Sequence, residues 1–264
     1  MLAAAISRYW PFANGSGRIL DKYARSIDLG SGERTAQTSD GFTMQVLADD
    51  LIGRHILMSG KFDRSIVQVL LDRAKPGDVL LDIGANIGYV SACFLKRVPG
   101  SHAICVEPQP GIVDLLHKNV RQFDGRAIVK PVALSDKPGE LRFHIDKDNR
   151  GSSKISPDGE ISVIAVSAAE LLAGVERVDL VKVDVEGHEE PVFRAMRNEL
   201  KRLKPRAILF EDHGDGAAPQ DGIGLIMTGL GYRVFGIDKR LLKTRLVLVE
   251  KSADCQFNDY LACA

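Results

Sequence analysis

Apolar residues recur along this chain with two alternating periods, one typical of buried strands and one typical of helices. From Val79 to Ile83 only Asp82 interrupts an apolar run, which predicts a strand buried on both faces. Helical spacing follows at residues 89–96 and returns at 189–203. Further strands are expected at residues 42–48, 102–107, 127–134, 178–184, 206–211, 232–237 and 245–250. Strands that alternate with helices predict an α/β fold with a doubly wound, mostly parallel sheet.

The turn after the first buried strand is rich in glycine. Gly84, Asn86 and Gly88 occupy alternate positions, and a helical pattern resumes at Tyr89. Strand, glycine-rich turn and helix form the corner at which open α/β sheets hold nucleotide-like cofactors. Glycines let the ligand approach the backbone, and the helix N-terminus offers free N–H groups.

Two common cofactor motifs do not fit this turn. A dinucleotide fingerprint requires glycine where the chain has Asn86 and Tyr89, and a P-loop requires lysine before serine or threonine where it has Tyr89-Val90. Asp82 followed by Gly-x-x-x-Gly suits a ligand with an adenosyl ribose and an amino-acid carboxylate but no pyrophosphate, a description that S-adenosylmethionine meets. An ordinary strand–helix turn is the alternative for this motif alone.

The end of the next strand supports an adenosyl site. Glu107 follows Asp82 at close to the interval, about 20 residues, at which an acid meets the ribose hydroxyls in doubly wound folds. In this topology the end of the third strand lies beside the adenine, so we expect Ala133 and Leu134 to form part of its wall. The expected cofactor-binding residues are Asp82, Gly84, Asn86, Gly88, Glu107, Ala133, Leu134 and Asp184.

Acids and histidines follow two later strands. In an open α/β sheet the carboxyl ends of the strands face the ligand crevice, so these side chains are expected to meet there. Side chains of these types can act as a general base, and the candidates are Asp184, Glu186, His188 and His213. His213 is favoured because imidazole titrates near neutral pH, with Asp184 and Glu186 placed near the substrate. A surface or capping role is the alternative for His188 and His213, and it is the expected role of His55, His102, His117 and His144.

A metal-assisted variant of this site stays open. Asp184, Glu211 and Asp212 are expected at neighbouring strand ends, and Mg²⁺ prefers carboxylate and water oxygens. A metal bound there would lower the pKa of a bound hydroxyl and replace the base.

Composition and length add fewer constraints. We predict an N-terminal extension at residues 1–40 and one α/β domain at 41–264, with a β-hairpin insertion at 139–166. Lys+Arg and Asp+Glu both total 35, so no overall attraction to nucleic acid is expected. The four cysteines form no C-x-x-C pair, the start lacks a signal-peptide pattern, and no apolar run approaches the roughly 20 residues that span a bilayer. A cytoplasmic protein without a transmembrane segment is expected.

Four motifs in this order resemble the FkbM-type S-adenosylmethionine-dependent methyltransferases. They lie at residues 81–88, 106–108, 132–136 and 178–189. The resemblance implies the class I methyltransferase fold, a Rossmann-like seven-stranded sheet with an antiparallel closing strand, and methyl transfer to a hydroxyl of a sugar or polyketide-type acceptor. The family often carries a glutamate after Gly60, whereas this chain has Lys61-Phe62-Asp63.

Two other classes of protein remain as alternatives. A non-catalytic cofactor-binding or scaffold protein is disfavoured by the acid-rich strand ends, since charge is costly to keep unless it is used or solvated. A nicotinamide-dependent oxidoreductase is disfavoured by the missing glycines. The neutral charge and the absence of an Asn-Pro-Pro-Tyr or Asp-Pro-Pro-Tyr run also disfavour a nucleic-acid methyltransferase. The sequence has no signature of the particular acceptor or of the oligomeric state.

Overall fold

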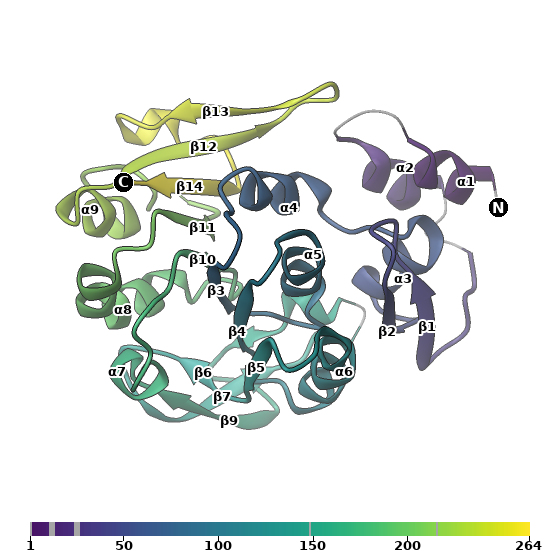
Figure 1. Ribbon diagram of the computed structural model, residues 1–264, viewed down its shortest axis with the longest axis horizontal. Coiled ribbons are helices and arrows are strands. Elements are labelled where there is room, and N and C mark those ends of the chain that lie inside the picture. Colours follow the sequence, from purple (N-terminus) through teal and green to yellow (C-terminus); the bar gives the residue numbers. More distant parts are fainter. Residues whose placement is uncertain (1, 11–13, 24–26, 148, 215) are drawn as a thin grey trace.

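The computed structural model describes residues 2–10, 14–23, 27–147, 149–214 and 216–264. A single eight-stranded sheet crosses the centre of the described chain (Figure 1). In spatial order its strands are β13 (Thr244–Leu248), β12 (Arg233–Lys239), β14 (Asp259–Cys263), β11 (Ala207–Glu211), β10 (Leu180–Val183), β3 (Val79–Ile83), β4 (His102–Val106) and β5 (Ala127–Lys130). The five strands from β11 to β5 are parallel, which confirms the predicted doubly wound α/β fold.

Helices cover both faces of this sheet (Figure 1). One face carries α4 (Arg64–Leu71), α5 (Tyr89–Arg97) and α6 (Pro110–Val120), and the other carries α7 (Ala168–Leu171), α8 (Glu189–Leu203) and α9 (Gly222–Gly229). Successive side chains of a strand point to opposite faces, so Leu80 packs in the first core and Leu81 in the second. Both leucines are fully buried, and this explains the continuous apolar run in the sequence.

The C-terminal strand β14 was missing from the predicted sheet. It pairs antiparallel with β11 on one side and β12 on the other, while the predicted closing strand, β13, lies at the sheet edge. The sheet therefore has eight strands rather than seven. Tyr260, Leu261 and Ala262 are fully buried. So short an apolar run after a polar loop does not show the alternation of a strand, so the sequence pattern did not reveal β14.

The predicted third strand, at residues 127–134, is wrong in its length. β5 ends at Lys130, and after Pro131, which has no N–H to donate, the chain leaves the central sheet. Residues Ala133–Leu134 form β6, which joins a second sheet of four strands. The other three are β7 (Gly139–His144), β8 (Lys154–Ile155) and β9 (Ile161–Val166), with β7 and β9 paired antiparallel.

The N-terminal region adds two short helices and a hairpin. The helices are α1 (Leu2–Arg8) and α2 (Ser16–Tyr23), and the hairpin joins β1 (Glu33–Gln37) to β2 (Thr43–Leu47). Helix α3 (Leu51–Ser59) follows and contacts both hairpin strands. Residues 11–13 and 24–26 of the predicted extension lie outside the described residues. Within the part that the structure describes, no helix has the length and apolar character needed to cross a bilayer.

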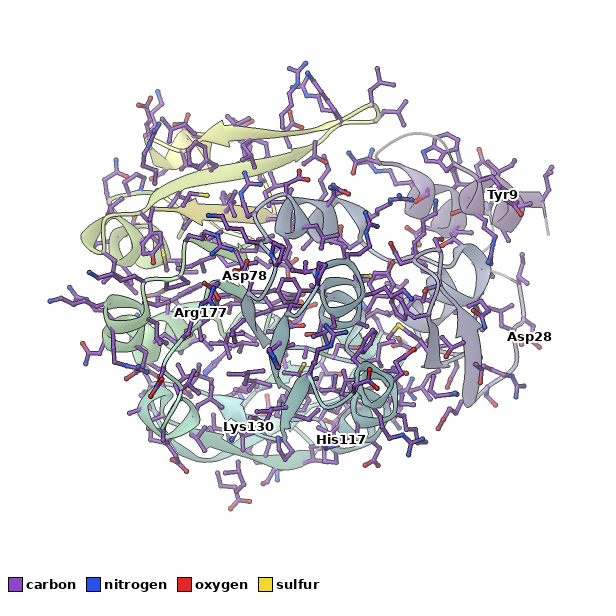
Figure 2. All side chains as sticks on the ribbon, in the orientation of Figure 1. Tyr9, Asp28, Asp78, His117, Lys130 and Arg177 are labelled. Atoms are coloured by element: carbon purple, nitrogen blue, oxygen red, sulfur yellow. The ribbon has the colours of Figure 1, made fainter. Side chains whose placement is uncertain are left out.

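A charged cluster ties together the amino ends of β3, β10 and β11. Asp78 is completely buried and forms ion pairs with Arg206 and with Arg177, whose Nη2 lies 3.4 Å from Asp78 Oδ1 (Figure 2). Asp179 also pairs with both arginines, with Arg177 at 2.8 Å and with Arg206 at 3.3 Å. Ion pairs thus occupy the amino ends of these strands. A ligand site is therefore expected at their carboxyl ends.

Candidate active site

A cavity of about 230 Å³ lies at the carboxyl ends of β3, β4, β10 and β11. The residues that follow these strands form one wall, and they include Gly84, Glu107, Asp184 and Glu211. Residues of α3, of the segment around Asp63 and of the insertion between β7 and β9 line the cavity as well. The structure thus brings most of the predicted residues to one cavity: Gly84, Asn86, Glu107, Ala133, Leu134, Asp184, Glu186 and Glu211 line it, whereas Asp82, Gly88 and Asp212 do not.

The glycine-rich turn is held close to the end of β10. Gly84 has a φ of +75°, and a Cβ atom there would lie 1.7 Å from the carbonyl oxygen of Asp184. Gly88 has a φ of +84° and precedes the first residue of α5. Its Cβ would lie 2.6 Å from Leu116 Cδ1. Both positions therefore require glycine, one to let two strand ends approach and the other to let α5 pack on α6.

Glu107 and Asn86 are joined directly. The backbone N–H of Asn86 donates to one carboxylate oxygen of Glu107, and that of Gln109 donates to the other, each at 2.9 Å. Burial raises the pKa of Glu107 to about 7, although these two hydrogen bonds favour the ionised form. A buried carboxylate fixed by backbone donors, with lone pairs free toward a cavity, is suited to accept hydrogen bonds from ligand hydroxyls.

Apolar residues line the cavity beside Glu107. Ala133 and Leu134 of β6 are buried and line it, and so do Val106 and Phe143. A flat aromatic base can bury its faces against such a wall.

Asp82 occupies a different place from the one expected for a cofactor ligand. It is completely buried and is not among the described residues that line the cavity. Its Oδ2 accepts a hydrogen bond from Ser91 Oγ at 2.6 Å, and its Oδ1 lies 3.4 Å from Lys182 Nζ. Asp82 thus contacts the glycine-rich turn indirectly, through Lys182, which donates to the carbonyl oxygen of Gly84.

Lys182 is a residue of the site that sequence reasoning missed. Its Nζ donates to the carbonyl oxygen of Gly84 at 3.0 Å and lies 3.3 Å from Asp184 Oδ2. Burial alone would lower the pKa of Lys182, but the charges of Asp184 and Asp82 outweigh it and raise the pKa above its usual range. The sequence signal was available, because a single cation inside a strand buried on both faces needs a charged partner.

Three of the side chains at the cavity rim lie together. The ligand atoms of Glu186, Glu211 and His213 are within 4.8 Å of one another, and His213 Nε2 lies 3.3 Å from Glu211 Oε1. Burial, then the charges of Asp184 and Glu186, raise the pKa of Glu211 to about 9. Glu186 and Glu211 line the cavity, whereas the His213 side chain is 56% exposed and contacts the site through Glu211.

The predicted Mg²⁺ ligand set is not assembled among the described residues. Asp212 accepts a hydrogen bond from the backbone N–H of Ala217 at 3.1 Å and holds the following loop. The group of three that does converge, Glu186, Glu211 and His213, shares only Glu211 with the predicted Asp184, Glu211 and Asp212. The geometry offers no support for the predicted set.

His188 and Glu189 shape the turn before α8. His188 lines the cavity, its Nε2 lies 3.0 Å from Ser135 Oγ, and burial lowers its pKa. Glu189 accepts hydrogen bonds from the backbone N–H groups of Val185 and Gly187, at 3.0 Å and 2.9 Å. Glu189 therefore holds the backbone of the turn that leads into α8.

Asp63 lies where the sequence departs from the FkbM pattern. It lines the cavity, and both its oxygens accept from Lys239 Nζ at 3.1 Å. Lys239 also pairs at 2.8 Å with Asp259, which begins the unpredicted strand β14 and lines the same cavity. Asp63 is therefore an ion-paired wall residue.

Together, the sheet order, the glycine turn beside Glu107 and the cavity at the strand ends define a Rossmann-like protein of the class I methyltransferase type. Residues 82–234, more than half of the chain, match the family described as Methyltransferase FkbM domain. The chain belongs to the FkbM methyltransferase family.

Two curated relatives share this region. The hexuronic acid methyltransferase AglP of Haloferax volcanii is 32% identical over 162 residues, which are 60% of this chain and 65% of AglP. The 2-O-methyltransferase NoeI of Sinorhizobium fredii is 30% identical over 165 residues, covering 54% of this chain and 66% of NoeI. The chain thus spans slightly less than two thirds of the length of each relative.

Solved structures are more distant. The crystal structure of Aeropyrum pernix fibrillarin with natively bound S-adenosyl-L-methionine is 12% identical, covers 91% of this chain and 85% of that chain, and has a TM-score of 0.45.

Proposed function

We propose that this protein is an S-adenosylmethionine-dependent O-methyltransferase that acts on a hydroxyl of a sugar or another small-molecule acceptor. The observation that carries the proposal is the buried carboxylate of Glu107, fixed by two backbone N–H groups at the wall of a cavity that Glu186 and Glu211 also line. One side of the cavity is suited to an adenosyl group, and the other to an oxygen that must lose a proton.

The residues present fit S-adenosylmethionine. Glu107 would accept from the ribose hydroxyls, Ala133 and Leu134 would cover the base, and Asp184, held by Lys182, offers a carboxylate to the amino group of the amino-acid end. The bound cofactor supplies a methyl group activated by a positive sulfur. The protein's own part is to bind, orient and deprotonate.

Orienting the acceptor oxygen is expected to lower the barrier of methyl transfer more than deprotonating it does. Holding an acceptor oxygen in line and about 3–3.5 Å from the methyl carbon can remove on the order of 7–11 kcal/mol of barrier. The side chains available to orient the acceptor include Asp63, Arg150 and Ser153, which line the cavity but do not belong to the glycine turn.

Deprotonation is assigned to the pair formed by Glu211 and His213. An alcohol is a poor nucleophile, so a base within reach contributes typically 10²–10⁴-fold. Glu211 lines the cavity and has a raised pKa, and His213 lies 3.3 Å from it on the solvent side. The acceptor proton passes to Glu211 and then to His213, while Asp184 and Glu186 set the charge around them.

The two relatives support an oxygen acceptor on a sugar. One is described as a hexuronic acid methyltransferase and the other as a 2-O-methyltransferase. A non-catalytic cofactor-binding protein is the competing class, and it predicts cofactor binding without methyl transfer to any acceptor.

A calorimetric titration tests the cofactor. Purified protein should bind S-adenosylmethionine and S-adenosylhomocysteine, and Glu107→Ala should abolish binding. The matched control is Glu140→Gln, which changes an exposed glutamate of β7. Absence of binding by folded wild-type protein would refute the proposal. Transfer of an isotopically labelled methyl group to a panel of sugars and oligosaccharides then separates an enzyme from a scaffold.

A further inference from the structure

Arg150 begins a short 3-10 turn, Arg150–Ser152, in the insertion between β7 and β8. Its backbone N–H donates to Asp50 Oδ1 at 2.7 Å. Asp50 is the N-cap of α3, and its other oxygen accepts from the N–H groups of Ile52 and Gly53. One carboxylate therefore joins the insertion to α3, and Arg150 lies where the two meet at the cavity.

The guanidinium group of Arg150 is only partly used. Its Nη2 lies 3.8 Å from Asp49 Oδ2, and its side chain is 21% exposed. Its Nη1 is buried and has no hydrogen-bond partner among the residues that the structure describes. A buried, charged donor without an acceptor is costly, so a site that keeps one is arranged for a ligand that supplies the acceptor.

A second cation of the insertion acts on the same cavity. Burial and Asp184 raise the pKa of Glu186, whereas the charges of His213 and Lys154 lower it. Lys154, in β8, is thus near enough to the rim for its charge to matter. The insertion contributes Arg150 and Lys154 to the surroundings of the site, and the strand ends contribute the carboxyl groups of Glu186 and Glu211.

We propose that Arg150 binds a carboxylate of the methyl acceptor, so that the acceptor is an acidic sugar rather than a neutral one. This inference rests on the proposed function, because it names the substrate class of that site. A guanidinium presents a planar fork of donors that matches a carboxylate. The acceptor is taken as the source of the carboxylate because Arg150 belongs to the insertion and is joined to Asp50, whereas Gly84 and Glu107, which are assigned to the cofactor, belong to the strand ends.

Binding of simple sugars tests this inference without requiring methyl transfer. Glucuronate and glucose are titrated into the protein, each with and without S-adenosylhomocysteine. We expect glucuronate to bind more tightly than glucose, and Arg150→Gln to weaken glucuronate about 10- to 100-fold while leaving glucose unchanged. Arg142→Gln, at an exposed position of β7 outside the cavity lining, removes the same charge from the same insertion and should change neither.

Two compounds related to the cofactor show whether Arg150 binds the carboxylate of the cofactor instead of that of the acceptor. If Arg150→Gln weakened S-adenosylhomocysteine but not 5′-methylthioadenosine, which lacks the amino-acid end, Arg150 would serve the cofactor and the inference would be overturned. Equal binding of glucuronate and glucose to the wild-type protein would overturn it too. A folded protein that binds glucuronate through Arg150 but never binds S-adenosylhomocysteine would uphold the carboxylate site and refute the methyltransferase proposal instead.

Discussion

The ammonium group of Lys182 donates to the carbonyl oxygen of Gly84 at 3.0 Å, from inside the neighbouring strand. Since Lys182 also lies 3.4 Å from Asp82 and 3.3 Å from Asp184, one buried cation connects the turn after β3 with the end of β10. The two motifs that are far apart in the sequence are thereby held as one unit. Asp82 and Lys182 act as positioning residues for groups that line the cavity.

Replacing Lys182 with methionine is expected to destabilise the protein by about 3–5 kcal/mol, because it leaves the buried carboxylate of Asp82 without its cationic partner. Urea unfolding followed by circular dichroism measures the change. Lys201→Met, at an exposed position of α8, is the control and should change stability by less than about 0.5 kcal/mol. A Lys182 variant as stable as the control would show that the cation is dispensable.

Cofactor binding is expected to depend on pH through Glu107. Burial raises the pKa of Glu107 to about 7, and ligand hydroxyls donate to the ionised form. Below that pKa, affinity for S-adenosylhomocysteine should therefore fall about tenfold for each unit by which the pH is lowered. Above that pKa the affinity should be constant. Calorimetry between pH 5 and pH 8.5, on the wild type and on Glu107→Gln, measures this. The glutamine variant has no proton to lose and should lack the pH dependence; if it kept the wild-type profile, the titrating group would lie elsewhere.

Much of the fold could be predicted because burial on two faces leaves a strong pattern. Leu80 and Leu81 enter different cores, so the first strand had to be apolar almost throughout, and Gly84 marked its end. The strand β14 escaped because five residues give too little pattern to outweigh their polar surroundings. Its position between β11 and β12 depends on pairing partners that are distant in the sequence.

The candidate site was predicted unevenly for a similar reason. Residue type and strand-end position are visible in the sequence, so Glu107, Glu186 and Glu211 were all expected at the rim. The direction of a side chain is not visible, and Asp82 points into the protein while Asp212 binds its own loop. Arg150 belongs to an irregular tract, and its contacts with Asp49 and Asp50 depend on a fold that joins residues far apart in the sequence.

The close approach of Gly84 to β10 predicts a specific effect of an added methyl group. In Gly84→Ala the new Cβ would lie 1.7 Å from the carbonyl oxygen of Asp184, on a residue with a φ of +75°. Gly174→Ala is a matched control, since Gly174 has the same φ and nothing within 4 Å of its Cβ position. The control should cost about 1–2 kcal/mol from backbone strain alone. Gly84→Ala should cost more and should also abolish binding of S-adenosylhomocysteine.

Urea unfolding and calorimetry on this pair of glycine variants separate strain from collision. Equal losses of stability, with cofactor binding kept in both, would mean that β3 and β10 can move apart freely. The proposed role of the tight turn would then be wrong.

His213 is expected to matter for turnover but not for cofactor affinity. Because it receives the proton through Glu211, His213→Ala should lower kcat by about 10²–10⁴-fold with a sugar acceptor, while calorimetry finds the affinity for S-adenosylmethionine unchanged. His144→Ala, which removes an exposed imidazole paired with Glu160, is the control. Full activity of the His213 variant would remove the histidine from the proton path and leave Glu211 alone in it.

The carboxylates around Glu211 predict the shape of the pH–rate profile. Burial and the charges of Asp184 and Glu186 raise the pKa of Glu211 to about 9, and only the ionised form accepts a proton, so kcat should rise with pH toward that value. In Glu186→Gln one of these negative charges is gone, the pKa of Glu211 falls, and the rise in kcat should move to lower pH. The pH–rate profiles of the wild type and of Glu186→Gln are measured between pH 6 and pH 10. An unmoved profile in Glu186→Gln would mean that Glu211 does not control the rate.

The same profiles are measured with EDTA, and we expect the chelator to leave both unchanged. Loss of activity with EDTA and its return with Mg²⁺ would favour a metal at the rim over the base.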